Sequence, residues 1–311
     1  MTKGTVVKST GSFYHIKTPE GKIFKGKIRG KFRIKGLKTT NPVAVGDIVH
    51  FKPLDNETVL ITHIEPRKNY LIRRATNLSK RYHILAANID RVFVLYTPAY
   101  PETLLPFLDR ILVSAEAFDI PAVMVINKID LFKDDPENRR KIERFKEIYG
   151  KAGYPVLEVS AKTGENLDEL KRYMRDKTSM FTGNSGTGKS SLINAVAGLD
   201  LRTKEISGVH RQGQHTTTFA EMHPLPFGGN IIDTPGIRAF GTIETKPQEL
   251  GDYFPEIRRW KPECKFNNCI HVHEPGCAVI PQVENGNIAP ERYNSYLDIL
   301  EEISGENSPY R

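Results

Sequence analysis

Residues 178–198 read TSMFTGNSGTGKSSLINAVAG, and this stretch decides the fold of the chain around it. It contains Gly183-x4-Gly188-Lys189-Ser190, the pattern of a phosphate-binding loop. The residues before the loop (178–182) predict a strand, and those after it (189–197) predict a helix that ends at Gly198. In such a strand, turn and helix, backbone N–H groups and the helix N-terminus surround a phosphate.

Three further segments complete a predicted guanine nucleotide site. Asn127-Lys128-Ile129-Asp130 follows an apolar run, and the Asp130 carboxylate can accept hydrogen bonds from the guanine N1–H and 2-amino group. Asn127 can pair with the other edge of the base, and the Lys128 stem can lie along the ring. Ser160-Ala161-Lys162 follows another predicted strand and can offer the Ala161 N–H to the guanine O6. Since adenine lacks this arrangement of donors, we expect GTP to bind better than ATP.

The fourth segment, Asp233-Thr234-Pro235-Gly236, supplies groups for the metal and the γ-phosphate. We expect Lys189 to reach the β- and γ-phosphates, Ser190 to bind magnesium, and Asp233 to hold the magnesium shell. The residues predicted to bind the nucleotide are Asn127, Lys128, Asp130, Ser160, Ala161, Lys162, Gly183, Asn184, Ser185, Gly186, Thr187, Gly188, Lys189, Ser190, Ser191, Asp233 and Gly236.

The order of these segments is permuted. In an ordinary small GTPase the phosphate loop comes first, whereas here the two guanine segments precede it. A permuted chain can build the same pocket because chain ends lie at the surface and often close together.

The group that orients the attacking water is not obvious from the sequence. Ile237 stands where many GTPases have a glutamine, and an isoleucine cannot bind water. The segment Gly213-Gln214-His215-Thr216-Thr217-Thr218 lies at the switch position, so one of its threonines is predicted as the second magnesium ligand. His215 is the candidate catalytic residue, and the alternative for it is a packing or partner-contact role.

All three cysteines of the chain fall in one short segment, Cys264-x4-Cys269-x-His271-x5-Cys277. Three thiolates and one imidazole complete a tetrahedral shell, which predicts one structural zinc ion rather than a disulfide framework. His273 is the alternative fourth ligand.

The N-terminal part is basic and reads as short strands. Residues 1–80 hold 17 Lys and Arg against 5 Asp and Glu, in a chain whose net charge is +8. Strands are predicted over 5–8, 13–17, 22–28, 48–51 and 59–64, which suggests an OB-like barrel, with an SH3-like barrel as the alternative. Eight cations without a carboxylate between Lys22 and Lys38 favour a polyanionic partner. Phe13, Tyr14, Phe24 and Phe32 could stack bases, but we expect most of them to lie in the core.

The remaining chain predicts two more domains. Apolar runs at 91–96 and 122–126 read as buried parallel strands, and 104–118, 137–149 and 167–174 have helical spacing. The predicted organisation is an OB-like barrel (1–68), a circularly permuted P-loop GTPase domain of the α/β class (69–240) and a mainly helical zinc-binding domain (241–311), with a clear helix over 293–303. No run of about 18 apolar residues is present. We therefore expect a soluble cytoplasmic protein.

Together, the permuted order, the basic barrel and the cysteine motif resemble the ribosome small subunit-dependent GTPase A family, RsgA or YjeQ. The resemblance covers all three domains and includes the Gly-x-His-Thr-Thr-Thr segment and His-x-x-Glu-Pro-x-Cys over 271–277, in which His271 is the zinc ligand. It implies a cytoplasmic GTPase that binds the small (30S) ribosomal subunit late in its maturation, and we expect the protein to be a monomer. It also implies contacts with 16S rRNA and faster hydrolysis on the subunit.

An alternative reading is a GTP-gated RNA-binding module that acts on another RNA through the same barrel. GTP hydrolysis that rises when small subunits are added favours the ribosomal function. GTP hydrolysis that no RNA stimulates favours the binding module.

Overall fold

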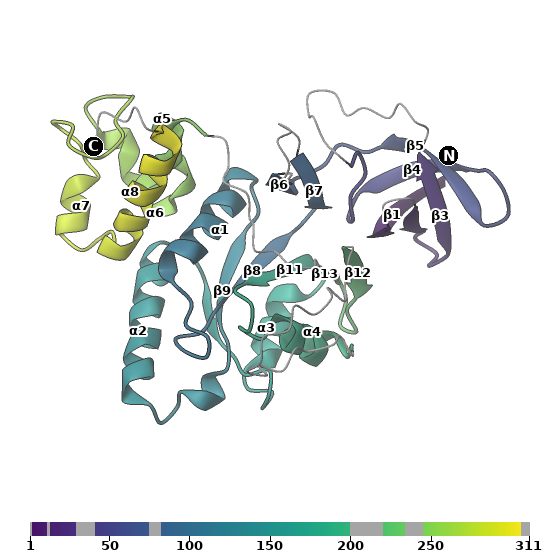
Figure 1. Ribbon diagram of the computed structural model, residues 1–311, viewed down its shortest axis with the longest axis horizontal. Helices are drawn as coiled ribbons and strands as arrows, with labels where there is room; N and C mark the ends of the chain where they lie inside the picture. The colour runs from purple at the N-terminus through teal and green to yellow at the C-terminus, as the bar shows by residue number, and fades with distance from the viewer. Residues whose placement is uncertain are drawn as a thin grey trace. The chain divides into compact units, whose positions relative to one another are not determined.

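A computed structural model describes residues 2–10, 13–28, 41–74, 82–199, 220–233 and 245–305 (Figure 1). The chain forms two compact units. The first unit comprises residues 1–92, 168–182 and 189–241, and the second comprises 93–167, 183–188 and 242–311. Among the described helices, none has the length and apolar character needed to cross a membrane.

The first unit contains the predicted N-terminal barrel. Its strands are β1 (Thr2–Ser9), β2 (Tyr14–Lys17), β3 (Ile23–Ile28), β4 (Ile48–Pro53) and β5 (Thr58–Ile64). They pair in the order β1-β2-β3-β5-β4, and β4 pairs again with β1, so the sheet closes. The parallel pairing of β3 with β5 is the OB topology. The OB-like expectation is therefore confirmed, and the SH3-like alternative is wrong.

Alternation along the strands forms the barrel core. In β2 and β4 every second side chain is buried, as expected for a sheet with one face inward. Tyr14 is buried in this core, and Phe24 packs against it with its ring centroid 5.5 Å from that of Phe51. Phe13 is partly buried, and Phe32 lies outside the described residues. The expected core role therefore holds for Tyr14 and Phe24.

The first unit also contains part of the α/β domain. Strand β11 (Thr178–Gly183) pairs in parallel with β13 (Asn230–Asp233), and β12 (Glu221–Pro224) pairs antiparallel with β13 on one side and with β1 on the other. Helices α3 (Leu167–Met174) and α4 (Lys189–Ala197) flank β11 in the sequence. A separate hairpin joins β6 (Tyr70–Arg74) to β7 (Tyr82–Ala87). Neither β12 nor this hairpin was predicted.

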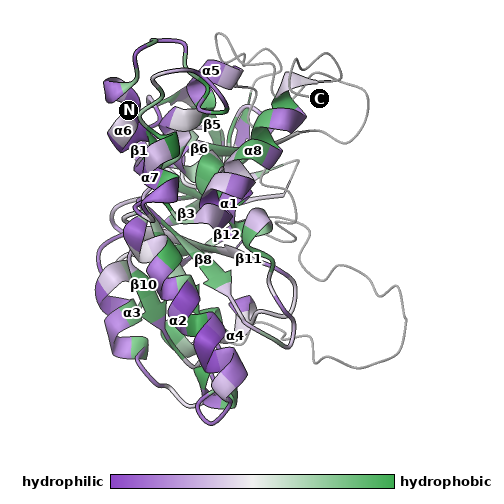
Figure 2. Ribbon diagram, turned by 90° about the vertical axis from the view of Figure 1, so that its left-hand side faces the viewer, coloured by the Kyte–Doolittle hydropathy of each residue, from purple (hydrophilic) through white to green (hydrophobic). Residues whose placement is uncertain are grey.

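In the second unit, β9 (Ala122–Ile126) lies between β8 (Arg91–Tyr96) and β10 (Val156–Glu158). All five residues of β9 are buried, which is typical of a parallel strand covered on both faces. Helices α1 (Leu105–Ala117) and α2 (Pro136–Lys151) follow β8 and β9 along the chain. Figure 2 shows green apolar colour on β8 and much purple polar colour on α2. The strands and helices of this region agree with the sequence prediction to within one or two residues.

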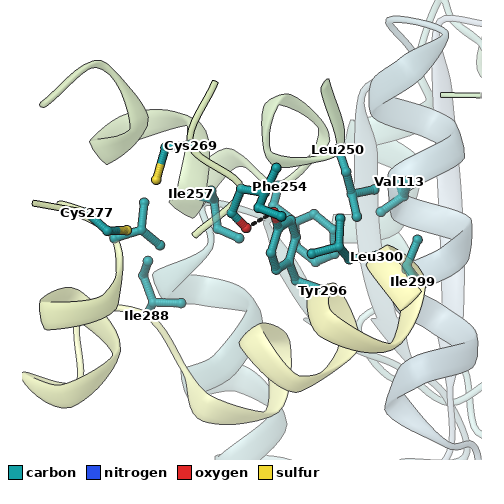
Figure 3. Close-up of a cluster of buried hydrophobic side chains, with 12 residues drawn as sticks. Val113, Leu250, Phe254, Ile257, Cys269, Cys277, Ile288, Tyr296, Ile299 and Leu300 are labelled. Atoms are coloured by element: carbon teal, nitrogen blue, oxygen red, sulfur yellow. Dashed lines mark hydrogen bonds between the residues drawn. The ribbon is translucent and has the colours of Figure 1, made fainter. Parts of the chain in front are cut away.

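Short helices dominate the C-terminal part of the second unit. They are α5 (Pro247–Leu250), α6 (Pro255–Trp260), α7 (Ile280–Glu284) and the longer α8 (Pro290–Ser304). Their apolar side chains form one cluster that includes Val113 of α1, beside Leu250 and Ile299 (Figure 3). The cluster therefore packs this mainly helical region against α1.

A buried ionic network reinforces the same packing. Arg292 of α8 is fully buried and donates to Glu256 of α6 at 2.6 Å and to Asp109 of α1 at 2.7 Å. The hydroxyl of Tyr149 in α2 donates to the same Asp109 oxygen at 2.8 Å. The guanidinium also lies over the Phe254 ring, 4.6 Å from its centroid. One cation thus joins four elements of the second unit.

Candidate nucleotide and metal sites

The phosphate loop has the backbone that its glycines allow. It leaves β11 at Gly183 and enters α4 at Lys189, so the predicted strand, loop and helix are all present. Gly188 has a φ of +92°, and a Cβ there would lie 2.3 Å from the Asn127 Nδ2. Only glycine tolerates both the left-handed backbone and this close approach.

Asn127 joins three of the predicted segments within the second unit. Its side chain is buried, and Nδ2 donates to the Thr187 carbonyl in the phosphate loop at 2.8 Å. Its Oδ1 accepts from the Ala161 N–H at 3.3 Å. The observed bonds of Asn127 and Ala161 are therefore to each other and to the loop, whereas the sequence led us to expect bonds to the base. Segments about 30 and 60 residues apart in the chain come together here through one side chain.

Asp130 is oriented by the next segment. Ser160 is buried, and its hydroxyl donates to the Asp130 Oδ1 at 2.6 Å while accepting from the Thr163 N–H at 3.1 Å. Asp130 itself is only partly buried. A carboxylate oxygen has two lone pairs, so Oδ1 retains an acceptor position beside the Ser160 bond. This geometry suits a carboxylate held ready for two donors on one edge of a base.

Lys128 lies beside both the phosphate loop and the segment that follows β8. Its Nζ donates to the Tyr100 carbonyl at 2.6 Å, and burial lowers the pKa of its ammonium while Asp130 raises it. Its backbone is left-handed, with a φ of 64°. Pro101 touches the loop as well, because a Cβ on Gly186 would lie 3.2 Å from the Pro101 Cδ. No motif in the sequence marks this contact of residues 100–101, and it was not predicted. Lys162 is exposed.

The predicted magnesium groups belong to the first unit. Lys189 and Ser190 open α4, and Asp233 ends β13. Burial is the main cause of a raised pKa at Asp233, while His223 lowers it, Glu221 raises it and Lys189 lowers it. A partly buried carboxylate near a lysine at a helix start is a suitable donor for a magnesium–phosphate complex. His215, Gly236 and the three threonines of 216–218 lie outside the described residues.

The cysteine segment folds into a compact four-ligand cluster. The ligand atoms of Cys264, Cys269, His271 and Cys277 all lie within 4.8 Å of one another. His271 is buried, and its Nδ1 lies 3.6 Å from both the Cys264 and Cys277 sulfurs. His273 is exposed. The donor set and its size therefore fit a tetrahedral zinc ion held by His271 rather than His273.

Glu274 holds the ligand loop in shape. Its carboxylate accepts from the Ile270, Val272 and His273 N–H groups at 2.7, 2.9 and 3.2 Å. Burial opposes its ionisation, but these backbone bonds outweigh burial and lower its pKa. This role of Glu274 was not predicted, although its place in the sequence between the ligands His271 and Cys277 was a signal for it.

Without a bound metal, burial favours the neutral forms of these ligands, which are protonated thiols and an uncharged imidazole. Burial raises the pKa of the Cys269 and Cys277 thiols and lowers that of the His271 imidazole. Zinc binding must then release thiol protons, so its affinity increases as pH rises.

Comparison with known proteins agrees with these features. A family described as RsgA GTPase matches residues 64–243, and one described as RsgA N-terminal domain matches residues 3–61. The chain belongs to the RsgA GTPase family. A relative from Christiangramia forsetii, named small ribosomal subunit biogenesis GTPase RsgA, is 51% identical over 99% of this chain and 98% of its own. An RsgA of the same name from Bacteroides fragilis is 48% identical over 99% of both chains.

Two solved structures share the fold over nearly the whole chain. YjeQ from Thermotoga maritima has 38% identity and a TM-score of 0.79, and the match covers 98% of this chain and 99% of that one. YloQ, described as a circularly permuted GTPase, has 29% identity and a TM-score of 0.75, with coverage of 98% and 95%. The predicted family and fold class are therefore confirmed.

Proposed function

We propose that the protein binds the small ribosomal subunit late in its maturation and hydrolyses GTP faster in that complex. The observation that carries the GTP-binding part of this proposal is the set of bonds through which Asn127 joins the two guanine segments to the phosphate loop. Full-length relatives named small ribosomal subunit biogenesis GTPases support the choice of partner.

The proposed nucleotide contacts follow from the geometry of each half of the site. In the second unit, Asp130 reads the guanine edge, while Asn127 and Ser160 hold its surroundings. Lys128 covers the base, Ala161 and Lys162 close its outer side, and the backbone of Gly183, Asn184, Ser185, Gly186, Thr187 and Gly188 binds phosphate. In the first unit, Lys189 binds the terminal phosphates, Ser190 and Asp233 hold magnesium, Ser191 adds a further contact, and Gly236 donates to the γ-phosphate. A magnesium ion bound there would polarise the terminal phosphates.

The barrel is the proposed contact for 16S rRNA. Lys22, Lys25 and Lys27 lie on or beside β3 and are exposed, and two of them lie over aromatic rings, Lys22 over Phe24 at 4.6 Å and Lys27 over Phe13 at 5.1 Å. Cations spaced along a strand can neutralise successive phosphates. The other five cations of the basic stretch, from Arg29 to Lys38, lie outside the described residues.

We further propose a monomeric, cytoplasmic protein with domain boundaries at 68/69 and 240/241. One zinc ion, held by Cys264, Cys269, His271 and Cys277, would stabilise the C-terminal domain as a second contact for rRNA. The cluster leaves no ligand position for a substrate, so its proposed role is structural.

His215 remains the proposed residue that orients the attacking water. The variant H215A should hydrolyse GTP at least about a hundredfold more slowly, the low end for loss of a positioned acid–base group. Its affinity for GTP should change little, because the base and phosphate contacts remain. Single-turnover hydrolysis and nucleotide binding measure the two effects separately, and an unchanged single-turnover rate would remove His215 from the mechanism.

The function is tested by GTP hydrolysis with and without purified small subunits. We expect a clear rise in turnover with small subunits and none with naked tRNA, and we expect the subunit to bind more tightly in one nucleotide state than in the other. Co-sedimentation with GDP and with a non-hydrolysable GTP analogue measures this second effect. Turnover that rises with tRNA, or that rises with neither small subunits nor tRNA, would contradict the proposal and favour an RNA-binding module of another kind.

A further inference from the structure

Strand β12 connects the barrel to the strand that carries Asp233. On one side of β12, Glu221 lies opposite Asp233 of β13, and on the other side Glu221 lies opposite Lys8 of β1. Lys8, Glu221 and Asp233 thus form a row across three adjacent strands. Side chains directly opposite one another in antiparallel strands stand on the same face and interact.

The row carries one positive charge, on Lys8, followed by two negative charges, on Glu221 and Asp233. The Lys8 ammonium binds the Glu221 carboxylate at 2.6 Å, and each side chain is about one-third exposed (36% and 33%). Glu221 and Asp233 are like charges in opposed positions, which repel each other. Lys8 therefore neutralises the Glu221 carboxylate, which lies opposite the proposed magnesium ligand Asp233.

A pocket that is partly open to solvent lies beside the row. The pairing of β1 with β2 shifts register between Val6 and Lys8, and a cavity of about 210 Å³ lies next to this shift. Its lining includes Thr5 and Val7 of β1, Met222 of β12 and Asn230 of β13. Lys8 and Glu221 do not line this pocket, so their ion pair is a separate contact between β1 and β12.

We propose that Lys8 and Glu221 are positioning residues for Asp233, and that this row transmits small-subunit binding at the barrel to the magnesium site. A partner that shifts β1 moves Lys8, and the ion pair moves Glu221 and the end of β13 with it. Coupling of this kind needs a continuous physical connection between two sites, and the three-strand row supplies one. This inference rests on the proposed function.

A purely electrostatic influence would give a different result from positioning. Magnesium-bound GTP is an anion, so loss of Lys8 would weaken its binding and loss of Glu221 would strengthen it. Under positioning, both losses break the same connection and act in the same direction. Exchanging the two charges between positions 8 and 221 then restores the ion pair and with it the connection. The electrostatic potential at Asp233 would not return to its original value after this exchange.

The experiment compares K8M, E221Q and the double variant K8E/E221K with the unmodified full chain. The quantity measured is the ratio of subunit-stimulated to basal kcat, together with KM for GTP and co-sedimentation with small subunits. K3M is the matched control, because Lys3 lies on the same strand but pairs at 2.9 Å with Glu65 of the barrel itself. Thermal unfolding of each variant verifies that it is folded.

We expect the ratio to fall at least about fivefold in K8M and in E221Q, the lower end of typical coupling between sites. Co-sedimentation and KM should change little, the double variant should recover most of the ratio, and K3M should match the unmodified chain. Unchanged ratios in K8M and E221Q, opposite changes in KM without loss of kcat, or no recovery in the double variant would each overturn the inference. An unmodified chain without stimulation would instead contradict the proposed function.

Discussion

Replacing Asp130 by asparagine should exchange guanine for xanthine as the preferred base. In the variant D130N, the side-chain oxygen can still accept from Ser160 and from the base N1–H, as Asp130 Oδ1 can in the native chain. The new amide then meets the guanine 2-amino group, donor against donor. Xanthine has a carbonyl at that position and accepts the bond instead.

The expected loss of GTP affinity in D130N is about a hundredfold or more, from one lost charged hydrogen bond and one buried donor left unpaired. Xanthosine triphosphate should bind and be hydrolysed by D130N better than GTP is. Competition binding with both nucleotides measures the exchange. The control D134N removes an exposed carboxylate four residues further on and should keep the preference for GTP. Equal loss of both nucleotides in D130N would contradict the role of Asp130 in base recognition.

Removing the metal ligands should unfold the C-terminal region. The variants C269S and H271A should each lose the bound zinc, because each removes one of four donors that lie within 4.8 Å of one another. Structural zinc sites contribute ~10 kcal/mol or more to the folded state, far beyond the stability of a small domain. A strong chelator should have the same effect on the unmodified chain.

Two measurements follow the loss of zinc. Elemental analysis gives the metal content, and fluorescence of Trp260, the single tryptophan of the chain, reports the packing of α6 against the cluster of Figure 3. The control H273A should keep both zinc and native fluorescence. Retention of zinc by H271A but not by H273A would reverse the assignment of the fourth ligand. Because burial raises the pKa of the Cys269 and Cys277 thiols, zinc should also be lost more readily as pH falls.

The sequence predicted the elements that carry strong local patterns. The glycine spacing of residues 183–190 located β11 and α4, and the apolar run at 122–126 located a fully buried strand. The cysteine spacing predicted a four-donor cluster that the structure brings together, while the choice of His271 over His273 came from the family resemblance. In each of these cases the signal lies within about twenty consecutive residues.

The features that were missed depend on partners far away in the sequence. Strand β12 is short, polar and ends in Pro224, so it gives no strand pattern, and its pairing with β1 joins residues 213 positions apart. Asn127 belongs to a recognised motif, yet its bonds to Thr187 and Ala161 require the folded chain. Arg292 reads as a surface residue of a helix, and only the assembled unit reveals that it is buried.

Because Arg292 binds Asp109 of α1 and Glu256 of α6, the second unit depends on helix α8 for its stability. If the chain stopped before Pro290, the carboxylates of Asp109 and Glu256 would lose the cation that bridges them inside the second unit. Burial of an uncompensated charge typically costs about 3–5 kcal/mol, a large part of what a domain of this size has to spare. Selection therefore cannot discard α8 without also rebuilding the interior against which α1 packs.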